Sequence, residues 1–427
     1  MSDKRQNFNK DLQYYKFCFY GFLKNLRLFE PFLILFFLEN ELTFLQIGIL
    51  YSIREITRGV LEIPAGIIAD SIGRKKTMVS SFVFYIISFI AFYISGSYAG
   101  FIIAMTLYSL GDAFRTGTHK AMIFDYLKIK GWDNQKVHYY GHTRSYSQLG
   151  SAVSALIAGF LVFFTGSFRM IFLFSTIPYV LDLILISSYP KELNGKIARF
   201  EKGKITANFR KVFFEFLYSF KEIKVLKAIV NLSVFTGYYK VLKDYLQPVL
   251  KTFAIALPVF MAFEEKQRAS VIIGITFFLI YLLTSYSSRN SGRFAAKFKN
   301  LNIPLNLTIV LGISVGALSG LLYQFNFYIL SIVFYIAIYV LENLRKPIGI
   351  SYVAESINKD ILTSVLSVES QAHTLVAILL APAFGFLADK LGLGYAIIII
   401  SLALLVISPF YLLRKNVPSP HFKKNSD

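Results

Sequence analysis

Two apolar segments of the chain are joined by Gly66-Ile67-Ile68-Ala69-Asp70-Ser71-Ile72-Gly73-Arg74-Lys75-Lys76. This stretch is typical of a helix that ends near an acid, followed by a glycine turn and a basic cluster. The flanking segments, 43–69 and 77–96, are long enough to cross a bilayer, which needs about 20 apolar residues. Basic connections between spans gather on the cytoplasmic side of membrane proteins. The stretch therefore predicts two membrane-spanning helices that are joined at the cytoplasmic face.

The composition extends this interpretation to the whole chain. Of its 427 residues, 55% are hydrophobic and 16% are charged, whereas a soluble protein carries about 25% charged residues. Disordered, fibrous and disulfide-stapled secreted chains are excluded, and the single cysteine, Cys18, permits no internal disulfide. Twelve apolar segments are predicted to span the membrane: 14–38, 43–69, 77–96, 100–124, 142–165, 168–189, 228–252, 268–288, 304–324, 327–344, 363–388 and 393–413.

The net charge of +20 indicates either a nucleic-acid partner or basic loops on the cytoplasmic side of a membrane. With the N-terminus inside, 31 of the 45 Lys and Arg residues fall in inner segments and five fall in outer loops. This asymmetry places both termini in the cytoplasm and explains the charge by topology, so we expect no nucleic-acid partner. The inner segments are 1–13, 70–76, 119–140, 190–227, 289–303, 345–360 and 414–427.

The two halves of the chain carry similar glycine patterns. Gly159-Phe160-Leu161 is followed by Gly166, and Gly385-Phe386-Leu387 is followed by Gly392 at the same spacing. Both patterns follow the fifth segment of their half, which suggests parallel repeats of a transporter. We therefore predict an N-terminal six-helix bundle over 1–189, a cytoplasmic basic linker over 190–227, a C-terminal six-helix bundle over 228–413 and a cytoplasmic tail over 414–427.

The stretch 66–76 resembles the signature loop of the major facilitator superfamily, GxxxDxxGR followed by two basic residues, between the second and third helices. Ser71 departs from the family pattern, which has a basic residue there. The counterpart in the second half, Arg289-Asn290-Ser291-Gly292-Arg293, lacks the acid. The resemblance implies an all-α membrane protein with twelve transmembrane helices in two six-helix bundles that are related by a pseudo-twofold axis.

In that family the acid of the loop meets a helix N-terminus across the interface between the halves, and the arginine pairs with an acid at the inner end of helix 4. Here Asp70 and Arg74 match these positions, and Asp125 is the candidate partner of Arg74. Arg115 followed by Gly117 resembles the family's arginine-bearing helix 4 in part, whereas the antiporter pattern GPxxGG of helix 5 is absent. The predicted gating loop comprises Gly66, Asp70, Gly73, Arg74, Lys75 and Asp125.

Charged side chains also occur inside the predicted spans, where each costs about 2.5–3.5 kcal/mol on insertion scales. Within a span they fall on one stripe at helical spacing, which indicates a face toward protein or water. They form either structural ion pairs between helices or the lining of a shared cavity, and we favour the cavity. Helices 3, 6, 9 and 12 are expected to support it from the lipid side, helix 6 carrying Asp182. The candidate residues for substrate and proton coupling are Lys24, Arg27, Glu30, Arg54, Glu55, Arg58, Asp112, Arg115, Lys240, Lys243, Asp244, Glu342 and Glu369.

These features predict a secondary active transporter that works by alternating access. The chain lacks the phosphate-binding pattern GxxxxGK followed by Ser or Thr, so ATP is not expected to drive it. A proton gradient acting through an embedded acid is expected instead, with Glu30, Glu55, Asp112, Asp244 and Glu369 as the acids considered. The many cations suggest an anionic or zwitterionic small organic solute.

Three alternatives were weighed against this interpretation. A broad-specificity drug/proton exporter fits the general style of the family. A transport-inactive receptor or scaffold would need a large extramembrane domain, and an enzyme would need a cluster of catalytic or metal-binding side chains that the sequence lacks. We expect a monomer in the cell (inner) membrane, with its substrate, protons and the lipid bilayer as partners and with no cofactor or metal.

Overall fold

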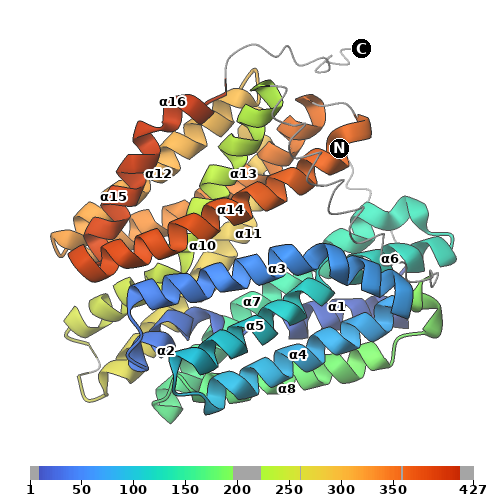
Figure 1. The fold of residues 1–427 in the computed structure, drawn as a ribbon, viewed down its shortest axis with the longest axis horizontal. Helices are drawn as coiled ribbons and strands as arrows, with labels where there is room; N and C mark the ends of the chain where they lie inside the picture. The colour runs from blue at the N-terminus through green and yellow to red at the C-terminus, as the bar shows by residue number, and fades with distance from the viewer. Residues whose placement is uncertain (1–8, 196–222, 260, 357–358, 414–427) are drawn as a thin grey trace, which may run out of the picture. The chain divides into compact units, whose positions relative to one another are not determined.

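The computed structural model describes residues 9–195, 223–259, 261–356 and 359–413, and this part of the chain is helical without any strand (Figure 1). Contacts divide the chain into two units. Unit 1 comprises Met1–Asn40, Ile53–Thr206 and Leu257–Tyr281, and unit 2 comprises Glu41–Ser52, Ala207–Ala256 and Leu282–Asp427. Most of the predicted linker, 190–227, and the whole predicted tail, 414–427, lie outside the described residues, and the predicted domain boundaries stay predictions.

Unit 1 is built from helices in which apolar residues recur at helical spacing. The helix α4 packs against α5 on one side and against α8 on another, and α1 packs against α7 and α8 (Figure 1). The longer helices of the unit are α1 (Leu12–Lys24), α3 (Phe44–Ile72, which begins in unit 2), α4 (Arg74–Ile94), α5 (Tyr98–Arg115), α6 (Thr118–Ile129), α7 (Lys136–Thr165) and α8 (Met170–Ser187). The shorter ones are η1 (Glu30–Phe32), α2 (Leu33–Glu39), η2 (Asp133–Gln135) and η3 (Lys191–Asn194).

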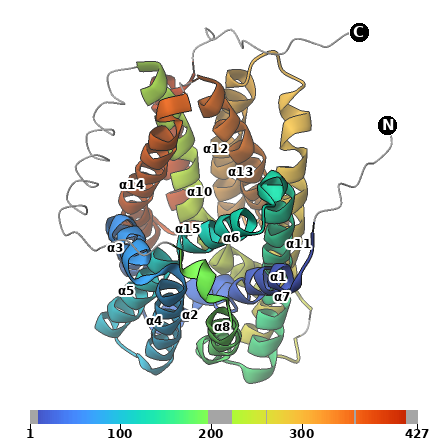
Figure 2. The same ribbon diagram turned by 90° about the vertical axis from the view of Figure 1, so that its right-hand side faces the viewer.

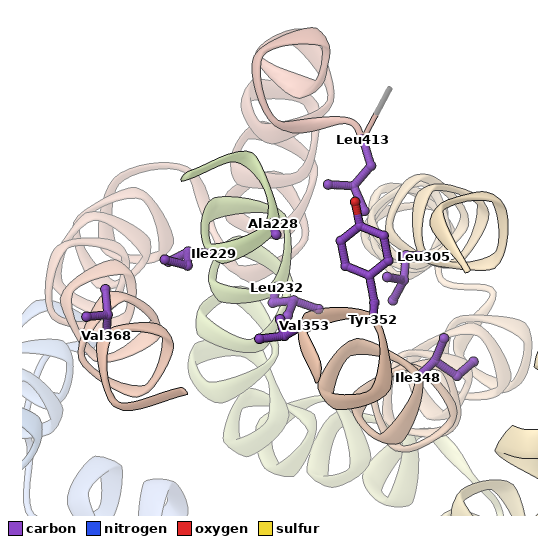
Figure 3. Packing of buried hydrophobic residues seen from close by; sticks show 9 residues of the cluster. All are labelled: Ala228, Ile229, Leu232, Leu305, Ile348, Tyr352, Val353, Val368 and Leu413. Atoms are coloured by element: carbon purple, nitrogen blue, oxygen red, sulfur yellow. The ribbon is translucent and has the colours of Figure 1, made fainter. Parts of the chain in front are cut away.

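In unit 2, α12 packs between α13 and α15, and α10 packs against α13 and α14 (Figure 2). A cluster of buried apolar side chains joins α10, α12, α13 and α14 near their ends, with Leu305 and Val353 fully enclosed (Figure 3). The helices of this unit are α10 (Ile223–Ala256), α11 (Glu265–Ala295, whose first half belongs to unit 1), α12 (Asn302–Gln324), α13 (Tyr328–Ser356), α14 (Lys359–Leu391), α15 (Leu393–Val406) and α16 (Ser408–Tyr411).

Seven helices in the described residues are long and apolar enough to cross a membrane: Arg74–Ile94, His138–Thr165, Met170–Ser187, Glu265–Ala295, Asn302–Gln324, Tyr328–Val353 and Val368–Leu391. The other predicted spans fall on helices that are interrupted, shorter or richer in charge. The chain is therefore a multi-pass membrane protein by its helices, and the count of twelve spans stays a prediction.

Two predicted segments are not continuous helices. The segment 14–38 is α1, a short 3-10 turn and α2, because the backbone leaves the helix at Asn25 and re-enters it around Pro31, which has no N–H to donate. The segment 100–124 divides into α5 and α6 at Gly117, whose φ of +79° lies in the left-handed region that favours glycine. Both interruptions place polar side chains at helix ends within unit 1, next to the site described below.

The predicted topology is tested with two cysteines in unit 1 in a Cys18→Ala background. Asn134→Cys, in the exposed connection between α6 and α7, is expected to react with a membrane-impermeant thiol reagent only in inverted vesicles. Ser97→Cys, the exposed N-cap of α5, is the matched outer position and is expected to react in intact cells. Labelling of Asn134→Cys from outside would reverse the orientation.

Candidate functional site

The residues of the predicted gating loop lie together in unit 1. Gly73 has φ +99°, a conformation that L side chains rarely adopt, and it ends α3 so that α4 can begin at Arg74. The Arg74 guanidinium contacts the carboxylate of Asp125 on α6 and lies 3.6 Å from that of Asp70. Lys75 donates to the carbonyl of Tyr189 at 2.8 Å. Arg74 and Lys75 thus tie the end of α3 to α6 and to the connection after α8, and the role of this loop in gating stays a prediction.

A second group of charges centres on Asp112 of α5. Its Oδ1 accepts hydrogen bonds from Arg115 Nη2 and from the Tyr85 hydroxyl, both at 2.8 Å. Its Oδ2 lies 3.6 Å from Nη1 of Arg58 on α3. Arg115 Nε also donates to the Tyr85 oxygen at 3.1 Å. The carboxylate of Asp112 therefore pairs with Arg58 of α3 and with Arg115 of its own helix. These three charges form an ion-pair cluster that links the two helices.

The other predicted charges of unit 1 pair locally. Arg27 lies 3.7 Å from Glu30, and Arg54 lies 3.4 Å from Glu55, measured between a guanidinium nitrogen and a carboxylate oxygen. Lys24 differs from them, because its side chain is only 8% exposed at the end of α1 and belongs to a cavity wall.

That cavity lies wholly in unit 1 and has a volume of about 380 Å³. Lys24 and Arg115 are its buried or half-buried cations, while Lys120 and Arg144 are exposed. The described lining contains no acidic side chain. Its full set is Phe17, Tyr20, Gly21, Lys24, Asn25, Arg115, Gly117, His119, Lys120, Ile123, Tyr140, Thr143, Arg144, Ser147 and Gln148.

Of these cations, only Lys24 and Arg115 belong to the predicted site. Lys120 and Arg144 fall at or beyond the ends of predicted spans, where basic residues are ordinary topological signals. His119 is stacked on Tyr20 with ring centroids 3.6 Å apart, and this contact joins α6 to α1. The glycine at position 117 is the sequence feature that could have predicted the places of His119 and Lys120. The interruption there turns α6 so that its first residues face α1 and α7.

The predicted residues of unit 2 form separate local contacts. Lys243 lies 3.5 Å from Asp244, and Glu369 lies 3.4 Å from His373 one turn later on α14. Glu342 of α13 is 3% exposed, and its Oε1 accepts a hydrogen bond of 2.9 Å from Thr236 of α10. Lys240 lies on α10 one turn after Thr236. In the described residues these acids and bases belong to α10, α13 and α14, which pack together.

Arg345 corrects one element of the sequence interpretation. It was placed at the start of an inner polar segment, 345–360, but α13 continues to Ser356 and Arg345 is 1% exposed. Its guanidinium donates to the carbonyls of Leu305 at 2.5 Å and Asn231 at 2.8 Å, and its centre lies 5.7 Å from the ring centroid of Phe235. Arg345 therefore links α13 to α10 and α12, and hydropathy alone gives no sign of that role.

In the part of the chain that the structure describes, no group of three or more His, Cys, Asp or Glu side chains could hold a metal ion. The site is instead a set of apolar helices around a polar cavity, which is the arrangement of a membrane transporter. The chain belongs to the major facilitator superfamily, because the model of that family matches residues 17–368.

Comparisons with individual proteins agree with this family. The chain is 24% identical over 384 residues to an uncharacterized MFS-type transporter, YxaM of Bacillus subtilis strain 168, covering 89% of this chain and 90% of that one. Its fold is similar to that of the nucleoside transporter NupG, with a TM-score of 0.75 at 14% identity over 94% of this chain and all of that chain. It is also similar to a POT family transporter in complex with 5-aminolevulinic acid, with a TM-score of 0.68 at 16% identity over 93% and 96% of the two chains.

Proposed function

We propose that this protein is a secondary active transporter of a small organic anion or zwitterion in the cell membrane, with twelve spans and both termini in the cytoplasm. The observation that carries the proposed substrate class is the cavity of unit 1, whose described lining holds four Lys and Arg residues and no acid. An anion in this cavity would meet cations from three helices, α1, α5 and α7, and from the start of α6.

The arrangement of the cations supports a path on which an anion first meets exposed cations and then a buried one. Lys120 and Arg144 are exposed and act at long range, where positive potential raises the rate of encounter with anions. Lys24 is buried, and a hydrogen bond between an ammonium group and a carboxylate or phosphate is about twice as strong as a neutral one. The neutral lining groups Asn25, Thr143 and Ser147 supply further donors and acceptors that would orient the solute.

Transport itself is proposed to follow from two halves that alternate around a central site. The contacts of Arg74 with Asp125 and Asp70 support a gating role for the loop 66–76, since they attach it to α6. Energy is proposed to come from the proton gradient. The nucleoside and 5-aminolevulinic acid named for the similar structures are solutes of those proteins, and both are small polar molecules.

Uptake by proteoliposomes tests this function directly. Carboxylates, phosphate monoesters, amino acids, neutral sugars and hydrophobic organic cations are compared with and without an imposed pH gradient. Accumulation of an anion or zwitterion that depends on the gradient is the expected result. Preferred transport of hydrophobic cations would instead support the drug exporter.

Lys24→Gln is expected to weaken binding of the transported anion by about ten- to hundredfold, because loss of a charge-assisted hydrogen bond costs about 1.5–3 kcal/mol. Lys16→Gln is the matched control, since Lys16 is a half-buried lysine of the same helix whose Nζ bonds Ser188 outside the cavity. Affinity is measured on the purified variants by scintillation proximity. Equal affinities of wild type and Lys24→Gln would exclude the cavity as the anion site.

A further inference from the structure

Asp182 of α8 is the most enclosed acid in the described part of the chain. Its exposed fraction is 0%, and neither carboxylate oxygen accepts a hydrogen bond from a described residue. Buried polar groups in native proteins nearly always have a partner, so such an exception calls for an explanation. The expectation that helix 6 supports the bundle from the lipid side stays a prediction; α8 exposes apolar side chains such as Ile177 and Ile184 and turns Asp182 into the core of unit 1.

The contact between α1 and α8 brings Lys24, the last residue of α1, to the part of α8 that carries Asp182. One turn before Asp182, the hydroxyl of Tyr179 donates to the backbone carbonyl of Lys24 at 3.1 Å, and residues three apart share one face of a helix. This hydrogen bond fixes the face of α8 that carries Asp182 against the end of α1. Lys24 therefore lies both at the contact between α1 and α8 and in the wall of the cavity.

The other titratable groups around Asp182 are phenols and one imidazole, that of His119 on α6, which stacks on Tyr20 and lies 3.3 Å from the Tyr189 hydroxyl. From α1 comes Tyr20, whose hydroxyl has no hydrogen-bond partner among the described residues. Tyr189 follows α8, and Tyr85 of α4 packs edge-on against Tyr179 with ring centroids 5.2 Å apart. The buried titratable group of α7 is Tyr139, which packs against Tyr14 of α1. Lys24, the last residue of α1, is the buried cation on the helix against which this face of α8 packs.

Most other candidate acids are already held as anions by a neighbouring cation. Asp112 is bound by Arg115, and Glu30, Glu55 and Asp244 each have a Lys or Arg within 4.0 Å. Glu342 of unit 2 is buried too, but it accepts a hydrogen bond from Thr236. An ion pair with Lys or Arg favours the ionised form of a carboxyl group. An enclosed carboxylate that accepts no hydrogen bond is unfavourable as an anion.

We infer that Asp182 is the proton-binding site of unit 1 and that its occupancy is coupled, through Lys24, to anion binding in the cavity. The inference rests on the proposed function for its anion. When the cavity holds no anion, Lys24 stabilises the Asp182 carboxylate. When an anion binds, Lys24 pairs with it, and the carboxylate takes a proton from water to form an O–H bond. A monoanion then binds together with one proton, and the net charge of the complex does not change.

Difference infrared spectroscopy of the purified protein in lipid nanodiscs tests the proton site without a transport substrate. Titration of wild type is expected to show a carboxylic acid C=O band that is lost in Asp182→Asn and kept in Glu342→Gln. In Lys24→Gln the midpoint of this band is expected to move by about one pH unit or more to higher pH, because the neighbouring positive charge is gone. A band that survives in Asp182→Asn, or that disappears in Glu342→Gln instead, would overturn the assignment.

The coupling is tested in the same titration with inorganic sulfate as the anion, at ionic strength matched with chloride. Sulfate is expected to move the midpoint of the wild-type band to higher pH and to leave Lys24→Gln unchanged. If sulfate has no effect on wild type, the coupling through Lys24 is wrong, even where the band belongs to Asp182. Failure of every anion in the uptake panel would contradict the proposed function instead, and the infrared result does not depend on that panel.

Discussion

Asp112→Asn is expected to lower the free energy of unfolding by about 3–5 kcal/mol, the usual effect of removing one partner from a buried ion pair. Asparagine keeps the size of the side chain and one oxygen, so the change isolates the loss of charge. Arg58 and Arg115 would then face each other without the anion that separates them, and the side chains of Asp112 and Arg115 are only 14% and 19% exposed. Repulsion between the two guanidinium groups therefore adds to the lost attraction.

The measurement is denaturant or thermal unfolding of purified protein in lipid nanodiscs. Asp133→Asn is the matched control, because Asp133 pairs with Lys136 at 2.5 Å in the same unit but is 49% exposed, and such pairs contribute less than about 1 kcal/mol. The double variant Asp112→Asn with Arg58→Gln is expected to recover part of the lost stability. Wild-type stability of Asp112→Asn would show that water, rather than this carboxylate, compensates the arginines.

Arg345→Met is expected to destabilise the protein by about 3 kcal/mol or more. Methionine retains an apolar stem in place of the first part of the arginine side chain but removes the donors to the carbonyls of Leu305 and Asn231. Each carbonyl would lose its charged donor, and a hydrogen bond to a charged group contributes about 1.5–3 kcal/mol. The contact of the guanidinium centre with the ring of Phe235 would be lost as well, so the measured loss includes this cation–π contact together with the hydrogen bonds.

Lys346→Met is the control for Arg345→Met, since it removes a cation from the next position of α13, where the side chain is exposed. It is expected to change the free energy of unfolding by less than about 1 kcal/mol. Arg345→Lys is expected to lie between the two, because an ammonium group lacks the planar fork that reaches two carbonyls on different helices. Equal effects of the methionine changes at 345 and 346 would contradict the linking role of Arg345.

Local sequence signals were sufficient for most helices of the described chain. Apolar length and the positions of basic residues identified α4 and α8 as spans, and both are long and apolar enough to cross a membrane. The interruptions of the first and fourth predicted helices were missed, because hydropathy averages over a turn such as that at Gly117. The helix α13 extends beyond the predicted span 327–344 for a related reason, since a basic residue such as Arg345 can lie inside a helix when its neighbours supply carbonyl acceptors.

For the candidate site, too, local sequence signals predict some contacts and miss others. The resemblance of residues 66–76 to the family's signature loop implies that Arg74 and Asp125 are partners, and the structure places them in contact. No local pattern distinguishes Lys24, which lines the cavity, from Arg27, which pairs with Glu30 three residues later. Their difference arises from the neighbours that α7 and α8 bring to the end of α1.

The sequence by itself determined the family, the membrane environment and the approximate helices, because hydrophobicity, charge asymmetry and a loop motif are properties of contiguous residues. The tertiary structure alone decided which charges are paired and which are enclosed. Asp182 illustrates the reason: on its own helix it is a single acid among apolar residues, and only the packing of α8 against α1 and α4 removes it from solvent and places it near Lys24. Burial and electrostatic pairing depend on residues far apart in the chain, so the chemistry of this site follows from packing rather than from pattern.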